Sequence, residues 1–160
     1  MKSLSSQTLN SLSSRQIGVL SSTQVQVLSS ATLNSLIGDT LRALNTADIV
    51  ALTTDQVKSL GSQALGAFSS VQIKAIETVD LAQLSSTQLS YLSSDQVVAL
   101  TSAQLVSLSS TQTPSLSTAA MAGLSSAQIS VLNNPSSAQM QAITTAQIAG
   151  FPPPVFAGFK

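Results

Sequence analysis

A large apolar residue recurs at every eighth position of this chain for about 130 residues. The series begins at Leu4, includes Phe68 and Ile76, and reaches Leu132 without a slip. After the insertion "NNP" (residues 133–135) the frame shifts by three residues, and two further octads follow, "PSSAQMQA" and "ITTAQIAG". Units this short cannot fold alone, because each must bury its apolar side chains against its neighbours. The period therefore predicts a repeat protein.

The other positions of the octad follow a pattern typical of helix starts. If the eight positions are lettered a to h from the leucine, Ser or Thr occupies b in fourteen of eighteen octads, Gln occupies e in eleven, and f is apolar in seventeen. A Ser or Thr followed three residues later by Gln is a capping box, in which each side chain binds the other residue's backbone N–H. The apolar residues at a and f flank the box as a hydrophobic staple. Position b is therefore predicted to be a helix N-cap.

The few charged residues agree with this frame. All six acids fall at b, d or e, where the helix dipole favours negative charge, and three of the bases fall at g, near the helix end. Arg15, at d, is the exception. The residues concerned are the acids Asp39, Asp48, Asp55, Glu77, Asp80 and Asp95 and the bases Arg42, Lys58 and Lys74.

We therefore expect an all-α fold, a solenoid of very short capped helices with one helix per octad, running from about c to h. A β-solenoid with two octads per coil is the alternative, because Ser, Thr and Val tolerate strands. The five-residue spacing of a and f argues against it, since an odd spacing places the two side chains on opposite faces of a strand. A single long helix is disfavoured because an eight-residue apolar period would spiral around its axis.

Three segments are expected: an octad solenoid over residues 1–132, re-phased octads over 133–150, and a Pro/Phe-rich tail over 151–160. Two kinds of departure lie inside the array. "LSSTQTPS" (108–115) replaces the apolar f residue with Thr113 and places Pro114 inside the expected helix; we interpret it as a tolerated irregular octad, with a hinge or partner site as the alternative. "LIGDTLRA" (36–43) and "LGSQALGA" (60–67) lack the Gln and are interpreted as drift.

Composition excludes several functions. Only 8% of the 160 residues are charged and the net charge is zero, so the clustered Lys and Arg of a nucleic-acid binder are absent. No apolar run approaches the roughly 20 residues that span a bilayer, so membrane insertion is not expected. There is no His and no Cys, which removes the commonest general base and the commonest soft metal ligands. We expect no enzyme activity, no cofactor and no metal site, and we interpret Glu77 and Asp80 as first-turn acids.

The last ten residues, "FPPPVFAGFK", differ in kind from the repeats. The prolines favour an extended polyproline conformation, and exposed phenylalanines on a nearly uncharged chain would promote association. The tail is predicted either to cap its own solenoid or to bind a neighbouring molecule. The expected assembly residues are Phe151, Pro152, Pro153, Pro154, Val155, Phe156 and Phe159.

Octads of the form "ALTTAQI" or "LSSDQV" resemble octapeptide repeats of large bacterial surface or secreted proteins, loosely labelled adhesin-like or haem-utilisation-like. The resemblance covers residues 4–150. It implies an extracellular or cell-surface bacterial repeat protein; with neither His nor Cys in the chain, no haem ligand is carried over. Met1-Lys2 leads into the first octad without the apolar stretch of a signal peptide, so the export route is unknown.

Two functions from different classes follow from these observations. The first is a structural protein that associates with copies of itself into a filament, sheath or adhesive layer. The second is a binding module whose solenoid groove holds a peptide, glycan or protein, including host or surface ligands. An ice- or surface-binding role is less favoured, because Ser rather than Thr dominates the polar rows.

Overall fold

A computed structural model describes residues 5–132 and 138–151 of the chain, and within these ranges every regular element is a helix. The all-α prediction is confirmed and the β-solenoid alternative is wrong. The elements are α1 (Ser6–Asn10), α2 (Ser14–Ile17), α3 (Ser22–Gln26), α4 (Ser30–Asn34), α5 (Gly38–Ala43), α6 (Thr46–Val50), α7 (Thr54–Lys58), α8 (Ser62–Ala67), α9 (Ser70–Ala75), α10 (Thr78–Leu81), α11 (Ser86–Leu89), α12 (Ser94–Val98), α13 (Ser102–Ser107), the 3-10 helix η1 (Thr113–Ser115), α14 (Thr118–Gly123), α15 (Ser126–Leu132), α16 (Ala138–Ala142) and α17 (Thr145–Gly150).

The helices begin where the capping argument places them. In α12, Ser93 at position b is the N-cap: its hydroxyl accepts from the backbone N–H of Gln96 at 3.3 Å, and Gln96 Oε1 accepts from the N–H of Ser93 at 2.8 Å. The same reciprocal box starts α2, α3, α6, α7, α9, α11, α13 and α17. Ser125 and Gln128 form it before α15. The sequence frame is thus confirmed to the residue.

The charged residues also take their expected places. Glu77 is the N-cap residue of α10, and Asp39, Asp48, Asp55, Asp80 and Asp95 lie in first turns. Arg42, Lys58 and Lys74 lie in last turns, where a cation complements the helix dipole.

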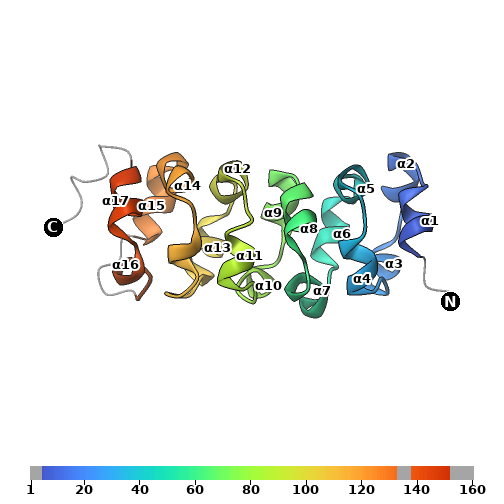
Figure 1. Ribbon diagram of the computed structural model, residues 1–160, viewed down its shortest axis with the longest axis horizontal. Helices are drawn as coiled ribbons and strands as arrows, with labels where there is room; N and C mark the ends of the chain where they lie inside the picture. Colours follow the sequence, from blue (N-terminus) through green and yellow to red (C-terminus); the bar gives the residue numbers. More distant parts are fainter. Residues whose placement is uncertain (1–4, 133–137, 152–160) are drawn as a thin grey trace.

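Each helix packs mainly on the third helix along the chain, as in the pairs α3 with α6, α6 with α9 and α9 with α12. Three octads therefore complete one turn of the solenoid, and successive turns stack as layers. Figure 1 shows the result as an elongated molecule, with α1 near one end and α17 at the other. The chain turns a corner between consecutive helices, at positions a and b, so corners also stack on corners.

The core is one continuous cluster that runs the length of the stack, from Leu9 to Phe151. Positions a and f supply most of it, with side chains at a buried from Leu28 onward and side chains at f buried up to Ile129. Isolated helices of four to seven residues are unstable in water, so burial between layers must supply the stability that helix propensity lacks. This matches the expectation for a repeat protein.

The glutamine at e links two layers. Gln96 Oε1 serves its own corner, while Gln96 Nε2 donates to the carbonyls of Leu65 at 2.8 Å and Phe68 at 2.7 Å, in the corner of the layer below. An amide is suited to this because it accepts and donates at once. Equivalent donations to carbonyls of the layer below are made by Gln56, Gln72, Gln88, Gln104, Gln112, Gln128, Gln139 and Gln147.

The octads 36–43 and 60–67, which lack Gln at e, are not drift, and that interpretation is wrong. Ile37, the N-cap residue of α5, has no polar side chain to cap the helix. Asn10 from the layer below accepts from the Ile37 N–H at 3.0 Å and donates to the Ser35 carbonyl at 3.0 Å. Where Gly61 starts α8, Asn34 does the same: it accepts from the Gly61 N–H at 2.7 Å and donates to the Ser59 carbonyl at 2.8 Å.

In both places the Asn stands at position g, four octads before the octad that lacks Gln at e. The Asn amide of the lower layer therefore bonds to the corner of the upper layer, whereas a regular Gln amide of the upper layer bonds to the corner of the lower layer. The link between the corners is kept and its direction is reversed.

In a third variation, two residues share the two roles of the Gln, which are to accept from the N–H at b and to donate to a carbonyl of the layer below. Asp48, at e, accepts from the Asn45 N–H at 3.1 Å but cannot donate, and the Asn45 side chain supplies the donor to the Gly18 carbonyl of the layer below. Asp48 is 1% exposed, and burial raises the pKa of its carboxyl, although the Asn45 N–H opposes the shift. In this octad the donor that an acid at e lacks is supplied from b.

The irregular octad at 108–115 keeps its corner. Ser109 and Gln112 form the reciprocal bonds, and Gln112 Nε2 donates to the Leu84 carbonyl at 2.6 Å. The helix is replaced by a turn and the 3-10 helix η1, in which Pro114 lies near the start. Thr113 fills the f position, fully buried, with its hydroxyl donating to the Ser109 carbonyl at 3.0 Å. These contacts favour the interpretation as a tolerated irregular octad.

Stacking also continues in register past the "NNP" insertion. Gln139 Nε2 donates to the Leu105 and Leu108 carbonyls, which are 34 and 31 residues earlier, whereas the regular separations at these two positions are 31 and 28, as for Gln96. The three extra residues thus change the chain distance and leave the corner partner unchanged. Residues 133–137 themselves lie outside the described residues.

Small residues at h allow close approach between layers near the C-terminal end. A Cβ added to Gly123 would lie 2.7 Å from Val98 Cγ2, and one added to Gly150 would lie 2.8 Å from the Thr118 carbonyl oxygen. Both distances are too short for a carbon–carbon or carbon–oxygen contact. A small residue at h therefore lets the layers pack closely at these two positions.

Candidate interaction surfaces

The predicted assembly residues fall almost entirely outside the part of the chain that the structure describes. Of the seven, only Phe151 is placed, and the segment 152–160 that holds the other six is not. Phe151 is 4% exposed and belongs to the hydrophobic core at position a, directly after α17. Its expected exposure is wrong, because the residue occupies the next a position of the octad frame. The assembly role of the tail remains a prediction.

Within the described ranges, no three His, Cys, Asp or Glu side chains gather as a metal ion would require. Asp80 is 4% exposed and accepts from the Thr54 hydroxyl of the layer below at 2.6 Å, a structural contact between helices. Glu77 makes no side-chain cap bond at the start of α10. In the same ranges no helix has both the length and the apolar character that a membrane span requires.

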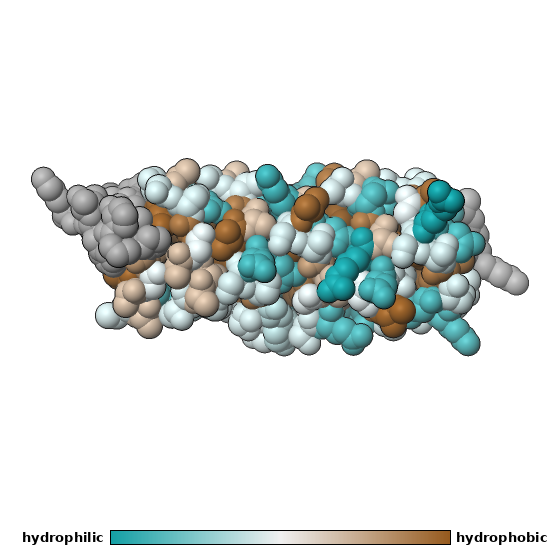
Figure 2. Space-filling view, turned by 90° about the horizontal axis from the view of Figure 1, so that it is seen from above, coloured by the Kyte–Doolittle hydropathy of each residue, from teal (hydrophilic) through white to brown (hydrophobic). Residues whose placement is uncertain are grey.

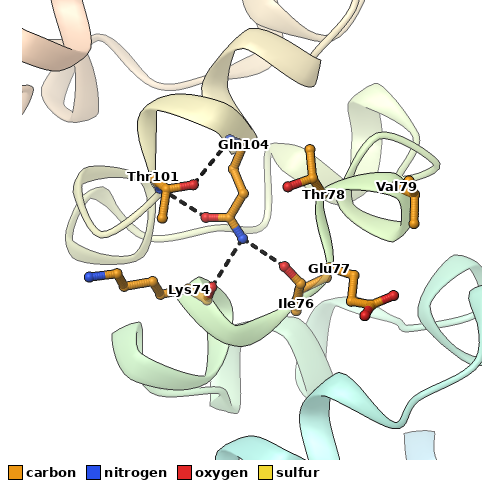
Figure 3. A pocket seen from close by; sticks show the side chains of 7 residues that line it. All are labelled: Lys74, Ile76, Glu77, Thr78, Val79, Thr101 and Gln104. Atoms are coloured by element: carbon orange, nitrogen blue, oxygen red, sulfur yellow. Dashed lines mark hydrogen bonds between the residues drawn. The ribbon is translucent and has the colours of Figure 1, made fainter.

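One open groove of about 510 Å³ lies at the corner between α9 and α10, with α13 above it. Figure 3 shows Gln104 at its centre, with Oε1 accepting from the Thr101 N–H at 2.8 Å and Nε2 donating to the Ile76 and Lys74 carbonyls at 2.8 and 3.3 Å.

The charged ends of Lys74 and Glu77 extend to opposite sides of this groove (Figure 3). The amide at its centre is already engaged by protein atoms. The groove therefore offers a bound molecule two separated opposite charges, hydroxyl groups of Thr78 and Thr101, and the exposed Val79.

Apolar side chains on the surface are scattered over many helices. The face in Figure 2 shows isolated brown side chains among pale ones, with the hydrophilic side chains gathered over the middle and N-terminal helices. The large exposed apolar residues among those described are Val19, Val27, Ile37, Val50, Val71, Val79, Tyr91 and Val106.

The distribution of charge along the chain is strongly uneven. Residues 96–159 contain no Asp, Glu, Lys or Arg at all, so every charged side chain but the terminal Lys160 precedes α13. The expectation of weak repulsion, based on the composition of the whole chain, applies most strongly to the C-terminal layers. The sequence contains this uncharged segment, but the charged fraction averaged over the whole chain does not reveal it.

Fold and surfaces together define a helical solenoid built from eight-residue repeats. Comparison with protein families agrees: the ALTTAQ repeat family matches residues 38–70 and 73–110, which supports the conclusion that the chain is a repeat protein. The second match ends at residue 110, after α13 and within the irregular octad 108–115. Neither a curated protein nor a solved structure matches the chain.

Proposed function

We propose that this chain is a non-enzymatic structural repeat protein, an extracellular or cell-surface subunit that associates with copies of itself into a filament, sheath or adhesive layer. The observation that carries the proposal is the uncharged segment 96–159 on an elongated stack of layers. Charge repulsion is a main barrier to association between protein molecules, and these layers lack it. The extracellular location is supported by the resemblance of the octads to those of bacterial surface proteins.

The polar side chains of the repeat support a structural role as well. Nearly every Gln at e, together with Asn10, Asn34 and Asn45, spends its hydrogen bonds on linking one layer to the next. Such groups serve the continuity of the array and are not available for chemistry on a substrate.

Sedimentation velocity and negative-stain microscopy of the purified full chain test this proposal. We expect particles whose length increases with protein concentration. Deleting residues 152–160 should leave the helical circular dichroism spectrum intact and abolish polymerisation, with Phe156→Ala/Phe159→Ala giving the same effect if those side chains are the anchors. Monomers at every concentration would contradict the proposal.

The location is tested separately, in the organism that makes the protein. External protease applied to intact cells should degrade it, whereas a cytoplasmic control protein should survive. Protection equal to that of the control would remove the extracellular part of the proposal and leave self-association unaffected.

The second candidate is a binding module that holds an extended peptide in the groove at α9, α10 and α13. The separated charges of Lys74 and Glu77 on either side of a partly apolar floor favour it. A peptide array probed with the parent protein and with Lys74→Ala/Glu77→Ala should give sequence-dependent binding that the double variant loses. Equal binding by both proteins would exclude this groove.

A further inference from the structure

The two ends of the solenoid leave different parts of the repeat uncovered. In the first layer the a residues Leu12 and Leu20 are only partly buried, while every described a side chain from Leu28 onward is buried. In the last layer the f residues Met140 and Ile148 are only partly buried, while the apolar f side chains from Leu9 to Ile129 are buried. Side chains at a thus need a layer on the N-terminal side, and side chains at f need one on the C-terminal side.

The hydrogen bonds have the same polarity. Gln16 and Gln24, in the first layer, accept from the N–H groups of Ser13 and Ser21 at 2.9 and 2.7 Å, as their counterparts in later layers do. This bond fixes the amide in the same orientation. Later glutamines such as Gln96 and Gln104 donate through Nε2 to a carbonyl 28 residues earlier. No octads precede the first layer among the described residues, and the Nε2 groups of Gln16 and Gln24 have no protein acceptor there.

The C-terminal layer presents the complementary group. Interior carbonyls at a, such as those of Phe68, Ile76 and Leu108, accept from a Gln of the layer above. The a carbonyls of Leu124 and Ile143 occupy equivalent corners in the last layers and receive no side-chain donor within the described chain. Among the described residues, the first layer therefore has amide donors without acceptors and partly buried a side chains, and the last layers have carbonyl acceptors without side-chain donors and partly buried f side chains.

The geometry points to head-to-tail stacking, in which the N-terminal layer of one molecule, with Gln16, Gln24, Leu12 and Leu20, packs on the C-terminal layer of a second copy. The contact would repeat the interface that already joins the layers inside the molecule. Because the two faces differ, the contact is heterologous, and it can propagate into a filament instead of closing as a dimer. This inference rests on the proposed self-association and names the surfaces that would carry it.

The pattern of donors and corners, and not charge, points to a second copy as the occupant. The receiving layers belong to the uncharged segment 96–159, so neither attraction nor repulsion of charges selects another partner. The C-terminal layer can recognise a partner only by the spacing of its corners and the pattern of its hydrogen-bond donors. The first layer of a second copy has both. The tail, 152–160, lies outside the described residues, and its role in association is tested by its own deletion.

The test replaces the donors and keeps the caps. Gln16→Glu/Gln24→Glu retains an oxygen that accepts from Ser13 and Ser21 but places a carboxylate where Nε2 would donate to a carbonyl. Thermal unfolding of the monomer should hardly change, whereas self-association should weaken by at least about tenfold in sedimentation velocity. Gln7→Glu/Gln26→Glu is the matched control, because it adds the same two charges to exposed positions of the same layer outside the corners.

The outcomes separate the two proposals. A parent protein that polymerises, with loss in Gln16→Glu/Gln24→Glu and none in the control, supports end stacking. If both double variants polymerise like the parent, end stacking is overturned and the proposed function stands. Equal loss in both would show that general charge repulsion acts, which also overturns the specific contact. A monomeric parent overturns both proposals together.

Discussion

At the scale of single residues, the amide of the Gln at position e both caps its own helix and joins two layers. A serine cap alone would start each helix, yet the Gln three residues later closes its own corner and ties down the corner below. Capping was predictable because both partners lie within one octad. The donation through Nε2 was not, because its acceptors lie 28 and 31 residues away, and no local pattern identifies them.

Replacing Gln96 with Glu separates these two roles. Gln96→Glu keeps the acceptor for the Ser93 N–H but sets a carboxylate against the Leu65 and Phe68 carbonyls in a site that is 3% exposed. We expect a loss of roughly 2–3 kcal/mol in the free energy of unfolding at pH 7. Urea denaturation measures it.

Gln24→Glu is the matched control for this variant. Its Nε2 has no acceptor within the described chain, so its stability should stay within about 0.5 kcal/mol of the parent. Equal losses in the two variants would show that the downward donation contributes nothing.

The asparagine substitutions predict a rescue. Asn34→Ala removes the only side chain that accepts from the Gly61 N–H in the described structure, which should cost about 1–3 kcal/mol. Adding Ala64→Gln restores an amide at e, and the double variant should recover much of that loss. A double-mutant cycle by urea denaturation gives the coupling, and independent, additive effects would contradict the exchange of Asn at g for Gln at e.

Asp48 gives the fold a pH dependence of its own. Burial raises the pKa of its carboxyl, so the folded protein favours the protonated form more than the unfolded chain does. The stability from this group is fully present below the unfolded pKa of about 3.9 and is lost as pH rises through the higher folded value. Asp48→Asn should therefore be more stable than the parent at pH 7, and this advantage should shrink toward pH 4. Unfolding curves across that range measure it, and a constant difference would be inconsistent with titration of Asp48.

At the scale of the helix, capping and burial between layers supply the stability that such short helices lack on their own. The frame of the helices, their N-caps and the positions of acids and bases followed from the sequence because helix starts obey local rules. The arrangement of three octads per turn did not follow, because the angle at each corner depends on packing between layers. The same limit explains why Asn10 and Asn34 looked unrelated to the octads whose corners they complete.

The cap frame has a direct test in α12. Ser93→Ala removes the hydroxyl that accepts from the Gln96 N–H and should cost about 1 kcal/mol, a typical value for an N-cap. Ser94→Ala changes the first helical residue, whose side chain makes no bond in the structure, and should be within about 0.5 kcal/mol of neutral. Thermal or urea unfolding of the pair decides, and the reverse order would shift the frame by one residue.

At the scale of the whole molecule, the stack behaves as a one-dimensional array in which each layer meets only the layers above and below it. Cooperativity in such an array depends on the interfaces between units. A lesion in a central layer should therefore uncouple the two halves, whereas the same lesion on the surface should leave them joined.

Val97→Asp places that lesion in α12. Val97 is fully buried at position f, in a helix that packs on α9 below and α14 above, so the carboxylate would be buried without a partner. We expect hydrogen exchange to accelerate in α9, α12 and α14 while α1 to α5 keep their protection. We also expect the parent to unfold in a single transition and the variant in two. Val79→Asp, at a residue that is 66% exposed, is the matched control and should leave both readouts unchanged. A uniform loss of protection along the whole chain would instead show that all the layers unfold as one unit.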